Sequence, residues 1–286
     1  MIKRPKINKD IKEAAKTLKE IMSEELTKIA DDLVNQVMVQ AKQLNPSERL
    51  KAISGLQARG VRAYTDLIKT ALSVIAFESL QKVRREVPKK KKVSLEENLD
   101  PIQLDEFDKL PPGIRKKILT QTNLLIGKQI GDLQKVIEFA YVTAEDETDS
   151  LEQIQADLND SAIGWLDGTA LETGASLNAS TIINSARNAF FFDDQVLEEV
   201  EAFEFVNGDP VTEICQDLNG TVFAKDDPAA DRYMPPLHWN CKSYIVPILK
   251  GNLGNKEIEK LKPSNKRLDA MVQFDEHQHC EDSTHV

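Results

Sequence analysis

The sequence predicts a mainly α-helical protein with a small α+β module near its C-terminus. Apolar residues recur every three or four positions over most of the first 200 residues, the period of a helix with one buried face. Between residues 200 and 249 the spacing changes to alternation, the period of a strand. We therefore expect a long N-terminal helical hairpin, a helical middle region and a short antiparallel sheet near residues 200–249.

The first helix is predicted from a continuous apolar stripe between Ile11 and Val37. A second helix is expected to begin at Asn45-Pro46, because Asn caps helices well and Pro is tolerated in the first turn. Its apolar positions extend to about Glu86, although Gly55 and Gly60 weaken it locally. Since the connection is short, the two helices should pair as an antiparallel hairpin.

The middle region shows helical periodicity again after Pro111-Pro112-Gly113, up to the acidic cluster at residues 145–149. Shorter helices are expected at residues 151–171, 179–192 and 194–201, with Gly168 and Gly174 as breaks. The alternating segments predict strands at residues 200–206, 221–224 and 244–248. One further helix is predicted at residues 256–262.

The chain is expected to divide into five parts. These are a long-helix N-terminal region (1–87), a basic linker (88–103), a helical middle region (104–199), a small Cys/His-containing β-rich module (200–250) and a polar, mobile tail (251–286). The linker contains four consecutive lysines, which are either solvated or in contact with nucleic acid or a protein ring: Lys89, Lys90, Lys91 and Lys92.

Charge is divided unevenly along the chain. Residues 1–100 hold 21 Lys and Arg against 14 Asp and Glu, and the other residues hold 16 against 33, so the two parts carry net charges of +7 and −17. A basic part can bind DNA or an acidic protein ring, or can simply keep long helices soluble. No run of about 18 apolar residues occurs, so we expect a soluble protein with no membrane contact, made in a cytoplasm. Three cysteines without framework spacing predict free or metal-bound thiols.

The residues that suggest chemistry gather between positions 209 and 243. Cys215, His238 and Cys241 are soft metal ligands, and the His-x2-Cys spacing allows the last two to bind one ion, which makes zinc a candidate. Thr212 stands where a Cys-x2-Cys knuckle would have its first thiolate, so a closed site needs another donor. The alternative is that both cysteines pack as small buried apolar groups.

The same window resembles the C-terminal domain of phage head morphogenesis proteins of the Mu gpF and SPP1 type. Those proteins carry a Cys, then Asp/Asn-Gly before an apolar strand, then Pro-Pro-x-His-x-Asn-Cys-Arg. The resemblance covers about residues 178–249 and departs from the pattern at Thr212 and Lys242. The motif residues it singles out are Asp209, Cys215, Asn219, Gly220, Pro236, His238, Asn240 and Cys241.

The resemblance implies a minor head protein without enzymatic activity, made in a bacterial host and located in the virion. Its implied partners are the portal protein and other head proteins, and DNA is a further candidate. The alternative is a metal-dependent nuclease that uses His238 and its neighbours, although such enzymes usually need a second His and the others lie in the tail. A Cys215/His238 nucleophile pair can also be drawn, but no phosphate-binding loop or cofactor fingerprint accompanies it.

Overall fold

The computed structural model describes residues 7–43, 48, 51, 53, 55–84, 107–108, 110–146, 150–208, 212–238 and 241–262. These residues form two compact units. One comprises residues 1–14, 73–115 and 177–286, and the other comprises residues 15–72 and 116–176. We call them the sheet unit and the helical unit. The predicted linker at 88–103 with Lys89 to Lys92 and most of the predicted tail, from residue 263, lie outside the described residues.

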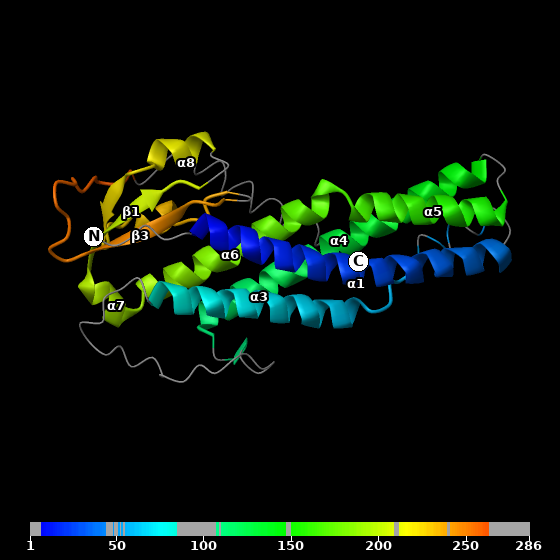
Figure 1. The fold of residues 1–286 in the computed structure, drawn as a ribbon, viewed down its shortest axis with the longest axis horizontal. Helices are drawn as coiled ribbons and strands as arrows, with labels where there is room; N and C mark the ends of the chain where they lie inside the picture. Colours follow the sequence, from blue (N-terminus) through cyan, green and yellow to red (C-terminus); the bar gives the residue numbers. More distant parts are fainter. Residues whose placement is uncertain are drawn as a thin grey trace. The chain divides into compact units, whose positions relative to one another are not determined.

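The predicted N-terminal hairpin is confirmed. Helix α1 spans Ile7–Gln43 and α3 spans Val61–Arg84, and the two lie side by side (Figure 1). Within the helical unit, the Arg59 amide donates to the Asp32 carboxylate near one end of the pair. Within the sheet unit, Lys82 Nζ donates to Asp10 at 2.9 Å near the other end. The earlier residue of α1, Asp10, pairs with the later partner, Lys82, and the later residue, Asp32, pairs with the earlier partner, Arg59. This order requires an antiparallel arrangement of the two helices.

The second helix does not run unbroken from Asn45 as predicted. Residues 44–47 lie outside the described part, and residues 55–60 form a non-helical turn before α3 begins. Gly60 has φ of 80°, in the left-handed region that glycine adopts without steric cost. The two glycines therefore end a short helical segment and reset the chain direction, where the sequence suggested only a local weakening.

In the described part of the helical unit, apolar faces from five helices pack together. Besides α1 and α3, they are α4 (Pro112–Asp146), α5 (Leu151–Leu166) and α6 (Thr169–Phe191). Gly168 separates α5 from α6 as predicted, but Gly174 lies inside α6 and does not break it. A Cβ at Gly174 would stand 3.3 Å from Leu125, so this glycine permits close packing against α4. The buried core includes Leu18, Met22, Leu26, Tyr64, Ile68, Leu72, Ile118, Leu133 and Leu158.

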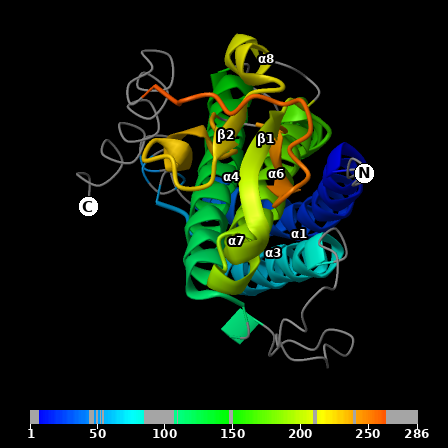
Figure 2. The ribbon, with the colours of Figure 1, turned by 90° about the vertical axis from the view of Figure 1, so that its left-hand side faces the viewer.

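The sheet unit contains the predicted three-stranded antiparallel sheet. Its strands are β1 (Val200–Val206), β2 (Val222–Ala224) and β3 (Tyr244–Leu249), in the order β2-β1-β3. The short helix α7 (Asp194–Glu199) leads directly into β1, and β2 lies beside β1 (Figure 2). The predicted fold class, mainly α with a small α+β module, is confirmed.

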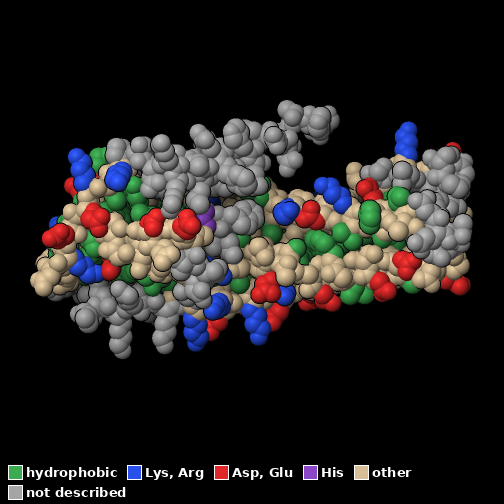
Figure 3. Space-filling model, turned by 90° about the horizontal axis from the view of Figure 1, so that it is seen from above, with side chains coloured by type: hydrophobic (Ala, Val, Ile, Leu, Met, Phe, Trp, Pro, Cys, Tyr) green, Lys and Arg blue, Asp and Glu red, His purple; other side chains and the backbone are tan. Residues whose placement is uncertain are grey.

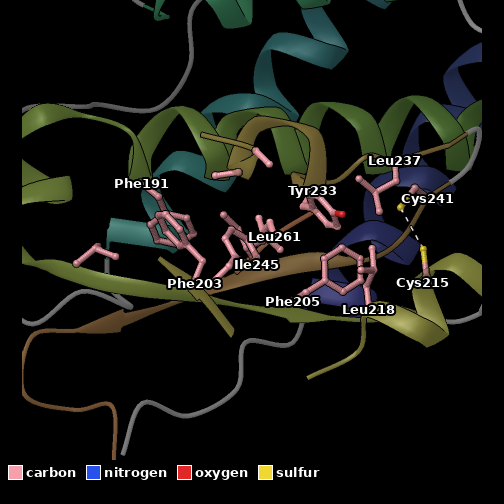
Figure 4. Close-up of a cluster of buried hydrophobic side chains, with 14 of the residues drawn as sticks. Phe191, Phe203, Phe205, Cys215, Leu218, Tyr233, Leu237, Cys241, Ile245 and Leu261 are labelled. Carbon is pink, nitrogen blue, oxygen red and sulfur yellow. Dashed lines mark hydrogen bonds between the residues drawn. The ribbon is translucent and has the colours of Figure 1, made fainter. Parts of the chain in front are cut away.

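Alternation along β1 places its residues on two faces of the sheet. Phe203 and Phe205 enter the main apolar cluster of this unit, and Ala202 packs on the other face with Val222 and Ile248. Figure 4 shows this cluster between the sheet and a helix that contributes Phe191 of α6. Buried Arg187 of α6 also donates to the carbonyl oxygen of Ile245 in β3, at 3.4 Å. The C-terminal part of α6 thus supports the sheet.

The predicted helix at residues 256–262 is wrong. Glu259 instead bridges to Phe223 of β2 in parallel, and its amide donates to the Val222 carbonyl at 2.7 Å. The Leu261 amide donates to the carboxylate of Asp227, and its side chain is buried. Because the backbone finds these partners on β2 and the following loop, the segment lies extended. None of the described helices combines the length and apolarity of a membrane span.

Candidate functional site

The candidate site lies in the sheet unit, where three separate segments meet. The first is the short helix α8 (Glu213–Leu218), which follows Thr212 and contributes Cys215. The second is the loop that contains His238, and the third begins at Cys241 and leads into β3. Cys215 Sγ, a ring nitrogen of His238 and Cys241 Sγ all lie within 4.8 Å of one another. The structure thus brings together the three residues that the sequence singled out as metal ligands.

The hydrogen bonds within this group centre on His238. Its Nε2 lies 3.1 Å from Cys215 Sγ and 3.0 Å from the hydroxyl oxygen of Thr212. The two sulfur atoms are 3.9 Å apart, and both cysteines are free (Figure 4). Thr212 occupies the N-cap position of α8, yet its side chain makes no cap bond. Its hydroxyl is directed to His238 instead, so the position predicted to lack a thiolate does take part in the cluster.

Both cysteines are also part of the apolar core, as the alternative interpretation predicted. Cys215 and Cys241 are 2% and 0% exposed and belong to the cluster that contains Phe205 and Leu218. His238 and Thr212 are partly exposed. The site is therefore a polar group of sulfur, nitrogen and hydroxyl atoms at the edge of an apolar core, closed on the cysteine side and open on the histidine side.

The hydrogen bond between the two thiols shifts their pKa values in opposite directions. A hydrogen bond from Cys241 chiefly lowers the pKa of Cys215, with further bonds from His238, Ser243 and Thr212, against the opposing effect of burial. The hydrogen bond with Cys215, then burial, raises the pKa of Cys241 above its usual range. The pKa of Cys215 is thus lowered and that of Cys241 raised by the same contact between their sulfur atoms.

Backbone groups approach the sulfur of Cys241 from its own loop. Hydrogen bonds from the backbone of Leu237 and Ser243 to this sulfur lower the pKa of Cys241, although the contact with Cys215 and burial outweigh them. The loop is held in turn by the Cys241 amide, which donates to the His238 carbonyl at 3.1 Å. Asn188 of α6 also donates to the carbonyl of Pro235 at 2.8 Å. The loop that contains His238 is therefore anchored on both sides.

Other motif residues shape the surroundings. Asn219 Oδ1 accepts from the Asn207 amide, and the Gly220 amide donates to the Phe205 carbonyl at 2.8 Å. Gly220 has φ of 85°, which explains a glycine at this turn. Pro236 follows a cis peptide bond in the loop before His238. Asp209 and Asn240, the two other predicted motif residues, lie outside the described residues.

Sequence reasoning missed Gly208, which allows β1 and the Cys241 segment to meet. A Cβ at this position would lie 2.2 Å from the carbonyl oxygen of Lys242, closer than real Cβ atoms approach. The Gly208 amide also faces the hydroxyl of Ser243, at 3.4 Å. A glycine two residues after a strand and before Asp-Pro was the available signal, but it equally fits an ordinary turn.

A comparison with protein families gives a match to this part of the chain. Residues 134–246 match the family described as Phage Mu protein F like protein. The other two comparisons, with curated proteins and with solved structures, give no match. The matched range contains α5, α6, α8, β1 and β2, and it includes Cys215, His238 and Cys241. The predicted resemblance is confirmed: residues 134–246, which make up less than half of the chain, are similar to the Mu F-like family of phage proteins.

Proposed function

We propose that this protein is a minor head protein of a tailed phage or prophage, acting near the portal in procapsid assembly, DNA packaging or ejection. The observation that carries the proposal is the match of residues 134–246 to the Mu F-like family. The role is structural, not catalytic, and its site is the virion. Its partners are the portal protein and other head proteins. The nuclease alternative needs a second histidine, and His277, His279 and His285 lie outside the described residues.

Exposed apolar side chains support a role in protein contact. Among the described residues, eight of the nine large hydrophobic side chains that are exposed belong to the helical unit, and Ile258 belongs to the sheet unit. Phe139 on α4 is 74% exposed and Ile163 on α5 is 54% exposed. Aromatic and large aliphatic side chains provide much of the binding energy in protein interfaces. The helical unit is therefore the part that we expect to dock on another head protein. Besides Phe139 and Ile163, the exposed large hydrophobic side chains of the helical unit are Val39, Leu67, Leu119, Leu124, Val142 and Leu151.

The charges of the described helices favour a protein partner over DNA for this part of the chain. Several lysines are paired with acidic residues one turn away, as in Lys28 with Glu24 and Lys128 with Asp132. On the face shown in Figure 3, described basic and acidic side chains are interspersed. Such pairs reduce the local positive potential on which sequence-independent DNA binding depends. Contact of Lys89 to Lys92 with DNA stays a separate prediction.

The proposal is tested by co-expressing the tagged protein with the portal and the other head proteins of its phage and isolating procapsids. We expect the protein in the procapsid fraction, and we expect the amount to fall when the portal is left out. Absence from procapsids assembled with the portal would refute the head assignment. An equal amount with and without the portal would refute the portal location.

Surface variants test whether the helical unit is the docking part. Phe139→Ser and Ile163→Ser should lower incorporation while the purified proteins keep their thermal stability, because both side chains are exposed. Ile258→Ser is the matched control, since Ile258 is 43% exposed but belongs to the sheet unit. Equal incorporation of all three variants would show that docking does not use these side chains.

A further inference from the structure

The donor atoms of the Cys/His site have the separations of a metal-binding site. With Zn–S near 2.3 Å and Zn–N near 2.0 Å, tetrahedral geometry sets S···S at about 3.8 Å and S···N at about 3.5 Å. Here the two sulfur atoms are 3.9 Å apart, and Cys215 Sγ lies 3.1 Å from His238 Nε2. The third pair, Cys241 Sγ and a ring nitrogen of His238, lies within 4.8 Å. A small movement of the loop that contains His238 would therefore place all three atoms around one ion.

The donor set and its surroundings fit zinc better than a hard cation. Two sulfurs and one imidazole nitrogen are soft or borderline ligands, which Zn²⁺ prefers over the oxygen ligands of Mg²⁺ or Ca²⁺. The backbone of Leu237 and Ser243 bonds the sulfur of Cys241, and the Ser243 and Thr212 hydroxyls bond that of Cys215. Hydrogen bonds to the ligating atoms are typical of metal centres, because they orient the ligands and stabilise their charge.

Thr212 lies on the side of the site where the fourth ligand of a tetrahedral ion is expected. Its hydroxyl lies 3.0 Å from His238 Nε2, on the part-buried side of the cluster, and the residue precedes Cys215 by three positions. In a closed knuckle this position would hold a thiolate that completes the tetrahedron. A threonine there leaves three strong ligands and a hydroxyl that can hold a water molecule.

We propose that Cys215, His238 and Cys241 bind one Zn²⁺ ion through their two sulfurs and Nε2, with a water held by Thr212 as the fourth ligand. Binding replaces the hydrogen bonds that Nε2 and the sulfurs now share, and any proton carried by these three ligating atoms is released to solvent or, for the imidazole, moves to Nδ1. The ion joins α8 to the loop before β3, which are separated by more than twenty residues of sequence. Its role is to stabilise the sheet unit, and it does not depend on the proposed function in phage heads.

The experiment uses the full chain with the other soft ligands removed. His277, His279 and His285 are changed to Ala and Cys280 to Ser, so that bound metal reports on the proposed site. The protein is purified in a metal-free reductant, loaded with ZnCl₂, dialysed and assayed for zinc per chain. We expect one zinc per chain and a higher melting temperature than after treatment with EDTA. Zinc at background level in the folded protein would overturn the proposal.

Cobalt reports on sulfur ligands in the protein with both site cysteines intact, so this first measurement does not depend on whether a cysteine variant folds. Co²⁺ added to the metal-free protein should give intense visible bands and a sulfur-to-metal charge-transfer band, as in tetrahedral thiolate sites. Cys215→Ser and Cys241→Ser should each lose zinc and weaken this band, whereas Cys280→Ser alone should change neither. A cobalt spectrum with no thiolate band, or zinc retained by both site variants, would overturn the ligand assignment.

The fourth position has its own test. Thr212→Cys completes a set of three sulfurs and one nitrogen and should lower the zinc Kd at least about tenfold, with a stronger charge-transfer band. Thr212→Val is the matched control, because it keeps the shape and removes the hydroxyl. We expect it to bind zinc about as well as the parent or more weakly. An unchanged Kd in Thr212→Cys would show that residue 212 does not face the ion.

Discussion

Substitution of Gly208 by Ala should destabilise the sheet unit and loosen the Cys/His site. The new Cβ would stand 2.2 Å from the carbonyl oxygen of Lys242, and moving it to 3.0 Å requires a shift of at least 0.8 Å in one of the two backbones. Both backbones are constrained, because Val206 pairs with Tyr244 in the sheet and Gly208 N faces Ser243. The strain therefore cannot be relieved by turning a side chain.

The magnitude follows from three effects. Overpacking of this kind costs about 1–3 kcal/mol, and losing the bond between Gly208 and Ser243 adds about 1 kcal/mol. The lower entropy of the unfolded chain with Ala opposes these by about 0.4–1 kcal/mol. We expect a net loss of about 2–3 kcal/mol and a fall in melting temperature of about 4–10 °C.

Circular dichroism melting gives the stability, and the reaction rate of Cys215 and Cys241 with a thiol reagent reports on the site itself. Both cysteines are buried in the parent protein, so faster labelling in Gly208→Ala would show local opening. Gly127→Ala is the matched control. Gly127 lies inside α4 with nothing within 4 Å of the added Cβ, so this change should stabilise by up to about 1 kcal/mol. An unchanged melting temperature and labelling rate in Gly208→Ala would refute the close approach.

Three further predictions concern stability. Burial, and secondarily the charge of Glu25, raises the pKa of Tyr64 above its usual range. The contribution of Tyr64 to the free energy of unfolding is fully present below about pH 10. It is lost as the pH rises further, since Tyr64 then releases its proton in the unfolded chain but keeps it in the folded protein. Urea titrations should show this alkaline loss, and Tyr64→Phe should reduce it. Phe203→Ala should cost about 3–5 kcal/mol in urea unfolding, because the ring is fully buried against Phe191, Phe192 and Phe223, whereas Phe139→Ala should cost less than about 0.5 kcal/mol. A double-mutant cycle on Glu204 and Lys256 should give a coupling of about 1 kcal/mol or more, since Glu204 is 12% exposed, and an exposed pair such as Lys9 and Glu13 should give less than about 0.5 kcal/mol. Equal coupling in the two pairs would count against the burial argument.

Local sequence determined most of the secondary structure. The apolar stripe of α1 and the alternation of β1 each depend on residues within one element, so a period of 3.6 or 2 is enough to identify them. Gly168 and Pro112 likewise act on the backbone at their own positions. Predictions failed where a distant partner decided the outcome. Gly174 lies inside α6 at a place where a Cβ would come within 3.3 Å of Leu125, and Glu259 is extended because its amide bonds the backbone of β2.

For the candidate site, the sequence alone identified Cys215, His238 and Cys241 by residue type and spacing, together with the resemblance to phage head proteins. Whether those side chains meet depends on the fold, because α8 and the His238 loop converge only when β1 pairs with both β2 and β3. Tertiary structure also decided that Thr212 turns its hydroxyl to His238 and that Gly208 lies against Lys242. Such contacts join residues far apart in the chain, and their geometry is set by sheet pairing and core packing, which periodicity does not encode.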